Sequence, residues 1–181
     1  MNNRVPGEGR YARLEREQRW RIGSVPTEAR RAVLILDRYI VGSRLRLRRV
    51  SGFADATTEP TFKLGQKVRA RLDDPEVVKL TNIYLDQNEY DVFATLAAAE
   101  LRKTRWKVAL EGRIVTIDQF HGRHDGLVLA EIELEANDIQ LTTLGIAAFD
   151  VTHDHRYSGG ALAFASDDEV TELIASGRAE S

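Results

Sequence analysis

Charged and apolar residues alternate along five short stretches of the chain. Residues 44–48 carry arginines at every second position, and residues 129–135 carry glutamates in the same way. Because side chains two positions apart on a β-strand point to the same face, each stretch predicts a strand with one charged face and one apolar face. The predicted charged faces are basic at residues 44–48, 61–67 and 103–107, and acidic or mixed at residues 15–19 and 131–135.

Weaker patterns and turn residues complete a mainly β outline that includes several helices. Asp86 is expected to cap a helix, because Glu89 stands three positions further on, at the capping-box spacing. The predicted strands are residues 10–22, 33–41, 44–50, 61–67, 76–84, 101–108, 113–120 and 127–136, and the last two form a hairpin. The predicted helices are residues 26–31, 86–97, 138–146, 157–164 and 168–175, and residues 1–9 are expected to form a loose tail.

Aromatic residues are assigned to the core and two histidines to an exposed turn. Both tryptophans lie on the apolar face of their predicted strands, which favours packing in the core over stacking on a nucleic-acid base. The two histidines are surrounded by glycines, which favours a surface turn over a metal site. The residues assigned to the core are Trp20, Trp106, Tyr11, Tyr39, Tyr84 and Phe93, and those assigned to the turn are His121 and His124.

Composition narrows the class of protein. With 181 residues and 43% hydrophobic content, the chain is long enough to bury a core and is expected to form a single domain. Its net charge of −2 speaks against nucleic acid or a membrane as partner, although 30% of the residues are charged. There is no cysteine, no apolar run of about 18 residues and no signal-peptide core, so a cytoplasmic protein is expected.

The charged strand faces can be arranged in two ways. They can face water around an apolar core, which is the more frequent arrangement for any one strand. Alternatively, they can point into the lumen of an antiparallel barrel, where crowded like charges require a neutralising ligand. Carboxylates suit a hard divalent cation such as Mg²⁺ or Mn²⁺, whereas arginines and lysines suit phosphate oxygens. The second arrangement therefore predicts a site for a metal-bound polyphosphate.

Six motifs, taken in order over residues 11–164, resemble those of the CYTH superfamily, the triphosphate tunnel metalloenzymes. Glu15-x-Glu17-x-Arg19 is similar to the N-terminal ExExK signature of this family, with arginine in place of the usual lysine. Arginine keeps the charge but does not lose a proton near neutral pH, which speaks against a base-like role at position 19. The other motifs are Leu45-Arg46-Leu47-Arg48, Thr61-Phe62-Lys63, Lys103-Thr104-Arg105-Trp106, Asp118-x-Phe120 with residues 126–134, and Val151–Tyr157 running on to Ala161-Leu162-Ala163.

The resemblance implies an eight-stranded antiparallel β-barrel with flanking helices and a charged tunnel. It also implies that Lys103 assists the attacking water or the leaving group and that Asp118 points inward. Since phosphoryl transfer requires an aligned water, Glu17 or another glutamate next to the metal is expected to orient it. Glu135 and Arg44 share the inward parity, but the alternative for both is a solvated strand end. The implied metal-side residues are Glu15, Glu17, Glu131 and Glu133, and the implied phosphate-binding residues are Arg19, Arg46, Arg48, Lys63, Arg105 and Arg156.

The expected function is hydrolysis of inorganic triphosphate or of a nucleoside triphosphate, with Mg²⁺ or Mn²⁺ as cofactor. A class IV-type adenylyl cyclase and a thiamine triphosphatase are the alternatives within the resemblance. A non-catalytic sensor of polyphosphate or nucleotide is the alternative from another class. The expected partner is a small-molecule triphosphate, and association of two chains into a homodimer is left open.

Overall fold

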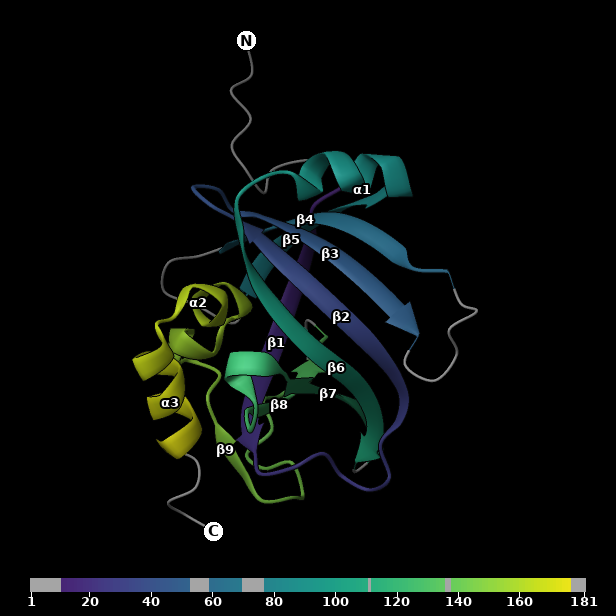
Figure 1. The fold of residues 1–181 in the computed structure, drawn as a ribbon. Helices are drawn as coiled ribbons and strands as arrows, with labels where there is room; N and C mark the ends of the chain where they lie inside the picture. The colour runs from purple at the N-terminus through teal and green to yellow at the C-terminus, as the bar shows by residue number, and fades with distance from the viewer. Residues whose placement is uncertain (1–10, 53–58, 70–76, 111, 136–137, 177–181) are drawn as a thin grey trace.

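The computed structural model describes residues 11–52, 59–69, 77–110, 112–135 and 138–176, and Figure 1 shows their arrangement. None of the helices in these ranges is long and apolar enough to cross a membrane. The strands are β1 (Arg13–Ile22), β2 (Arg30–Ile40), β3 (Leu45–Gly52), β4 (Thr61–Arg69), β5 (Val77–Leu85), β6 (Ala98–Leu110), β7 (Arg113–Phe120), β8 (Val128–Glu133) and β9 (Ala148–Asp150). The helices are α1 (Gln87–Ala94), α2 (Gly159–Phe164) and α3 (Asp167–Ser176), with 3₁₀ turns η1 (Gly122–His124) and η2 (His155–Tyr157).

Eight antiparallel strands form a closed barrel. The strand order is β5-β4-β3-β2-β6-β7-β8-β1, and pairing of β1 with β5 joins the two ends of the sheet. The short strand β9 adds to β1 outside this ring. The predicted mainly β fold, an eight-stranded antiparallel barrel with flanking helices, is confirmed.

The outer faces of the strands are apolar, and other segments cover them. On β2 to β5, residues such as Leu47 and Phe62 pack against Tyr90 of α1. On β1, β6, β7 and β8, a second cluster around Trp20 and Ile117 is covered from outside by residues of the connections at 23–29 and 138–147. Because the outward side chains form the core, the charged side chains on the other face of each strand point into the barrel interior.

The inward faces of several strands change from charged to apolar within two residues. Figure 1 shows α2 and α3 packed together against the barrel, and their residues Leu162 and Leu173 belong to the apolar cluster that this change creates. The charged and apolar neighbours on the same inward face are Lys103 and Leu101 on β6, Asp118 and Phe120 on β7, and Glu131 and Leu129 on β8. The barrel interior is therefore apolar next to α2 and α3 and charged beyond them.

Two predicted helices are wrong, whereas the others are present. The capping box of Asp86 and Glu89 begins α1 as expected, with Glu89 N–H donating to Asp86 Oδ1 at 2.8 Å. Residues 26–29 form a turn closed by Ala29 N–H donating to Pro26 O at 3.1 Å, and β2 begins directly after it, with Arg30 paired to Lys107 of β6. The segment predicted as a helix at 138–146 is irregular, and the Gln18 side chain bonds both the N–H and the C=O of Leu141.

The expected environment of several aromatic and histidine residues also needs correction. Trp20, Trp106, Tyr39 and Phe93 pack in the core as predicted. Tyr11 is exposed, and so is Tyr84, which lies at a strand end beneath the ammonium of Lys63. His124 is 2% exposed instead of lying on the surface, because its Nε2 bonds Leu162 O at 2.9 Å and holds α2 in place. The predicted tail at residues 1–9 lies outside the described residues.

Candidate functional site

Strand register brings the acidic residues of the two chain ends onto neighbouring strands. In the pairing of β1 with β8, Arg19 lies opposite Glu131 and Glu17 lies opposite Glu133. Glu15 is two positions before Glu17 and therefore points to the same face. Directly opposed carboxylates repel each other, so the Glu17–Glu133 pair favours the presence of a cation between the two strands.

A chain of ion pairs crosses the barrel interior from β1 to β6. Arg19 Nε donates to Glu131 at 2.7 Å, and Arg105 Nη2 lies 3.4 Å from the same carboxylate. Arg105 also donates to Asp118 at 2.6 Å, and the ammonium of Lys103 donates to Asp118 at 2.5 Å. Charges predicted from separate motifs thus form one contiguous network.

Burial and neighbouring charges act on this network in opposite directions. Burial by itself would raise the pKa of Glu131 and of Asp118, since it disfavours the ionised carboxylate. Arg19 and Arg105 outweigh burial and hold the pKa of Glu131 well below its usual range. Lys103 and Arg105 lower the pKa of Asp118 in the same way. Both groups are therefore carboxylates at neutral pH, and burial lowers the pKa of Lys103 despite the opposing effect of Asp118.

A second carboxylate anchors the arginines of β3. Asp37 is 0% exposed and accepts two hydrogen bonds from Arg48, at 2.6 and 2.7 Å. Arg46 lies 3.6 Å from the same carboxylate. The two guanidinium groups outweigh burial and lower the pKa of Asp37. Arg46 and Arg48 are thereby fixed while their side chains keep 15% and 13% exposure.

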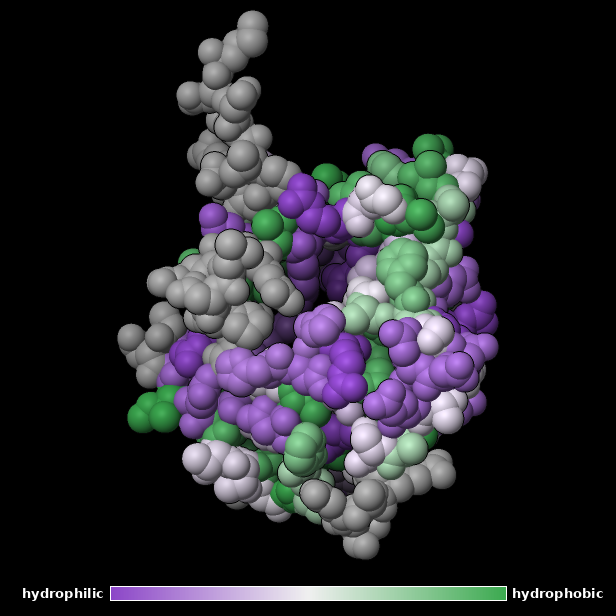
Figure 2. Space-filling model, turned by 90° about the vertical axis from the view of Figure 1, so that its left-hand side faces the viewer, coloured by the Kyte–Doolittle hydropathy of each residue, from purple (hydrophilic) through white to green (hydrophobic). Residues whose placement is uncertain are grey.

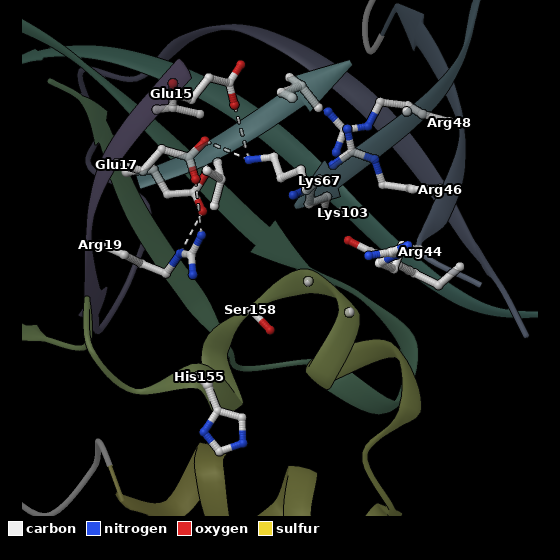
Figure 3. Close-up of a pocket in the computed structure, with 18 of the residues that line it drawn as sticks. Glu15, Glu17, Arg19, Arg44, Arg46, Arg48, Lys67, Lys103, His155 and Ser158 are labelled. Atoms are coloured by element: carbon white, nitrogen blue, oxygen red, sulfur yellow. Dashed lines mark hydrogen bonds and ion pairs between the residues drawn. The ribbon is translucent and has the colours of Figure 1, made fainter. Parts of the chain in front are cut away.

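The charged part of the barrel interior is a cavity of about 600 Å³. In the described chain, its lining includes eight cationic and five carboxylate side chains. Figure 3 shows Glu15, Glu17 and Arg19 on one wall and the arginines of β3 on the opposite wall. Figure 2 shows a hollow lined with hydrophilic residues on one face of the molecule. The charged lining residues are Glu15, Glu17, Arg19, Arg44, Arg46, Arg48, Lys63, Lys67, Lys103, Arg105, Glu131, Glu133 and Asp154.

Eleven of the residues singled out from the sequence line this cavity, and three do not. Asp118 is buried directly behind Lys103 and Arg105. Glu135 is exposed beyond the end of β8. Arg156 is exposed too, and its guanidinium pairs with Asp154 at 2.7 Å instead of reaching into the cavity.

Sequence reasoning missed several residues of the site. Asp37 follows the apolar residues 32–36 of β2, and this carboxylate next to an apolar run could have marked it as a site residue. Lys67 shares its strand face with Lys63 and lines the cavity beside Glu15 and Glu17. Tyr39 and Ser158 also line it, and no alternation pattern marks Ser158, because it belongs to the turn before α2.

The donors that could hold a metal are the glutamates of β1 and β8. Their carboxylate oxygens fit a hard divalent cation in chemical type. As they stand, however, no three metal-ligating side chains of the described residues converge closely enough to hold an ion. Lys67 contacts Glu15 and Glu17, while Arg19 contacts Glu17 and Glu131, so these carboxylates are engaged in ion pairs.

Comparison with known proteins supports the fold. No protein-family model matches the chain, and neither does any curated protein sequence. A crystal structure of the protein NE1496 has 21% sequence identity and a TM-score of 0.53, covering 83% of this chain and 98% of NE1496. A crystal structure of the inorganic triphosphatase NE1496 has 22% identity and a TM-score of 0.53, covering 84% and 95%. Together with the closed eight-stranded barrel, this likeness shows that the chain shares the fold of NE1496.

Proposed function

We propose that the protein hydrolyses a triphosphate, which binds in the barrel cavity together with Mg²⁺ or Mn²⁺. The observation that carries this proposal is the separation of charge inside one cavity, with carboxylates on β1 and β8 and cations on β3, β4 and β6. A triphosphate with a divalent cation presents the complementary distribution of charge. The inorganic triphosphatase NE1496, which has a similar fold, adds support.

Arg46 and Arg48 would bind phosphate oxygens. Asp37 holds both guanidinium groups from below, so they need little rearrangement to meet a ligand. Donors that are fixed before the reaction stabilise the charge of a transferring phosphoryl group more effectively than mobile donors. Lys63 on β4 and Arg105 on β6 would complete this cationic side of the cavity.

Lys103 is the candidate proton donor or positioning group for the leaving oxygen. Its ammonium lies between the cavity and Asp118, and it donates a hydrogen bond to Asp118 Oδ2 at 2.5 Å. Burial lowers the pKa of Lys103, which brings an amine closer to the range where proton transfer is effective. Asp118 would keep this amine aimed at the cavity.

Glu15, Glu17 and Glu133 are the residues that would hold the metal. Glu131, which the resemblance also assigns to the metal, is paired with Arg19 and Arg105. When bound, the metal would neutralise charge on the phosphate oxygens. Glu17 would also orient the attacking water, because its carboxylate faces the cavity beside Glu133. Phosphoryl transfer requires mainly such positioning and charge stabilisation from the protein.

Inorganic triphosphate is the first candidate substrate. A nucleoside triphosphate is the second, and the side chains of β5 that line the cavity support it. The inward residues of this strand, Val78, Leu80 and Asn82, are uncharged, so this wall of the cavity has no cations that would need a phosphate as partner. That wall could accept the organic part of the substrate. Product analysis with ATP separates the possible reactions, since free phosphate indicates a hydrolase and cyclic AMP indicates a cyclase.

The proposal is tested by phosphate release from inorganic triphosphate and ATP, each with Mg²⁺ or Mn²⁺. We expect Glu133→Gln to lower metal-dependent turnover by at least about a hundredfold, as for a lost metal ligand. Glu100→Gln, on the outer side of β6 next to Arg102, is the matched control and should keep full turnover.

No phosphate release from any triphosphate with either metal would refute the proposed hydrolysis. If a triphosphate nevertheless bound tightly with metal, the protein would be a non-catalytic sensor. Unchanged turnover in Glu133→Gln, with the fold intact by circular dichroism, would remove that residue from the metal site.

A further inference from the structure

Lys67 occupies a place between the glutamates of β1. Its ammonium donates to Glu17 at 2.9 Å and lies 3.3 Å from Glu15. Figure 3 shows both contacts on the acidic wall, with the lysine reaching across from β4. Lys67 therefore offsets part of the negative charge of the carboxylates that the proposed function assigns to the metal.

We propose that Lys67 is an internal counter-cation that a divalent metal must displace in order to bind Glu15 and Glu17. This inference rests on the proposed function, because it takes the carboxylates of β1 as metal ligands. It adds a residue that sets metal affinity without being a ligand.

Electrostatics explains why a cation is needed at this place. Glu17 lies directly opposite Glu133, and Glu15 is on the same strand face. Three carboxylates facing one cavity repel one another, and this repulsion would destabilise the barrel in the absence of metal. The ammonium of Lys67 offsets part of that repulsion, so removing it without a substitute is unfavourable.

Lys67 is also suited to leave. Its side chain is 36% exposed, compared with 8% for Lys103, so its ammonium can withdraw into solvent or towards other groups in the cavity. A compact ammonium on a flexible four-carbon stem makes point contacts that rearrange easily. The released ammonium would be free to pair with a phosphate oxygen of the incoming triphosphate.

If Lys67 exchanges its glutamates for a phosphate oxygen, binding of the metal and binding of the triphosphate become coupled. Metal alone must break the contacts of Lys67, whereas metal arriving with triphosphate supplies the lysine with a new anionic partner. Each ligand then favours binding of the other, because the lysine contact opposes metal only when phosphate is absent. The consequence is weak binding of metal by the free protein.

The test is a titration of the protein with Mn²⁺ alone. The electron paramagnetic resonance signal of free Mn²⁺ measures how much of the ion is bound. We expect Lys67→Gln to bind Mn²⁺ about tenfold more tightly than the unaltered protein, since no tethered cation competes. Lys67→Arg keeps the charge and should bind like the unaltered protein. Lys79→Gln removes a lysine from the outer face of β5 and should change nothing.

A second measurement uses the unaltered protein, in case Lys67→Gln does not fold. Mn²⁺ should increase acylation of Lys67 by an amine-reactive ester, as measured by peptide mapping. Displacement releases the amino group from its carboxylate partners, so that it can lose a proton to solvent and attack the ester. Acylation of Lys79 should stay constant. Unchanged reactivity of Lys67 at saturating Mn²⁺ would overturn the inference.

Two outcomes separate this inference from the proposed function. Equal Mn²⁺ affinity of Lys67→Gln and the unaltered protein, or no binding by either, would overturn the role of Lys67 whatever the turnover. Tighter Mn²⁺ binding by Lys67→Gln in a protein that hydrolyses no triphosphate would refute the proposed hydrolysis and leave the role of Lys67 standing.

Discussion

The buried carboxylate of Asp37 supports the arginines of β3. It is 0% exposed, follows the apolar residues 32–36 of β2 and bonds Arg48 through both of its oxygens. A buried charge is tolerated only when it is paired, so Asp37 and the arginines above it depend on one another. Positioning of the phosphate-binding groups is therefore inseparable from the stability of this part of the barrel.

Replacing Asp37 by asparagine tests this dependence. We expect the free energy of unfolding to fall by about 3 kcal/mol, because two largely buried guanidinium groups lose their counter-charge. Urea unfolding at neutral pH measures the change. Asp91→Asn on the exposed face of α1, where Asp91 bonds only Gln87 among the described residues, is the control and should change the stability by less than about 0.5 kcal/mol.

The pH dependence of the same variant has a definite sign. Arg48 and Arg46 lower the pKa of Asp37 in the folded protein. A lowered folded pKa gives a contribution to stability that is present above the unfolded value of about 4 and is lost as the pH falls further. The difference between Asp37→Asn and the unaltered protein should therefore shrink below about pH 4. A difference that is constant with pH would contradict the assignment of charge to Asp37.

At the scale of elements, the docking of α2 depends on close approach to β2. A Cβ atom on Gly159 would lie 2.1 Å from the hydroxyl oxygen of Tyr39, far inside contact distance. The next residue, Gly160, would place its Cβ 3.8 Å from the Tyr39 ring, which is ordinary contact. The helix that lies between the apolar and charged parts of the interior thus needs glycine at only the first of these two positions.

This difference predicts opposite results for two similar substitutions. Gly159→Ala should destabilise the protein by roughly 1 to 3 kcal/mol through overpacking. Gly160→Ala should be neutral or slightly stabilising, because alanine favours helix. Urea unfolding of both variants checks the prediction, and Tyr39→Phe should recover part of the loss in Gly159→Ala. Equal stability of the two glycine variants would contradict the close approach.

Strands with a strong period were predictable from the sequence, whereas two of the five predicted helices are absent. The alternation in β3 and β8 identified those strands and the residues that share a face. The helix expected at 26–31 rested on Pro26 at its start and Glu28 in its first turn, and these residues form a turn instead. The connection at 138–147 is irregular and covers the outer face of the barrel with apolar residues. Arg156 was assigned from the resemblance of its motif and not from alternation, and it lies in the 3₁₀ turn η2, where it pairs with Asp154.

At the scale of the whole molecule, the net charge and the cavity charge have opposite signs. The chain carries a net charge of −2, whereas cations outnumber carboxylates along the cavity lining of the described chain, eight to five. A polyanion is therefore attracted by the cavity and not by the molecule as a whole. Such local attraction is stronger inside a cavity of low dielectric than on an exposed surface.

Inorganic triphosphate without metal should therefore stabilise the protein. At a ligand concentration about 100 times the dissociation constant, the gain is roughly 2.7 kcal/mol. For a protein of this size, the thermal midpoint would rise by about 5 to 10 °C. Differential scanning fluorimetry measures this rise, which should decrease as salt is added. A rise of the same size with orthophosphate at equal ionic strength would mean that the cavity does not select a triphosphate.

The sequence by itself determined which side chains share a strand face, because a strand alternates strictly between its two sides. It could not determine which face is the inner one, since alternation looks the same for a charged exterior and a charged interior. Only the tertiary structure decided that, by closing β1 onto β5 and covering the apolar faces with α1 and the long connections. Closure also set the register that places Glu17 opposite Glu133 and brings Lys67 within reach of both glutamates of β1, contacts between residues far apart in the chain that no local pattern encodes.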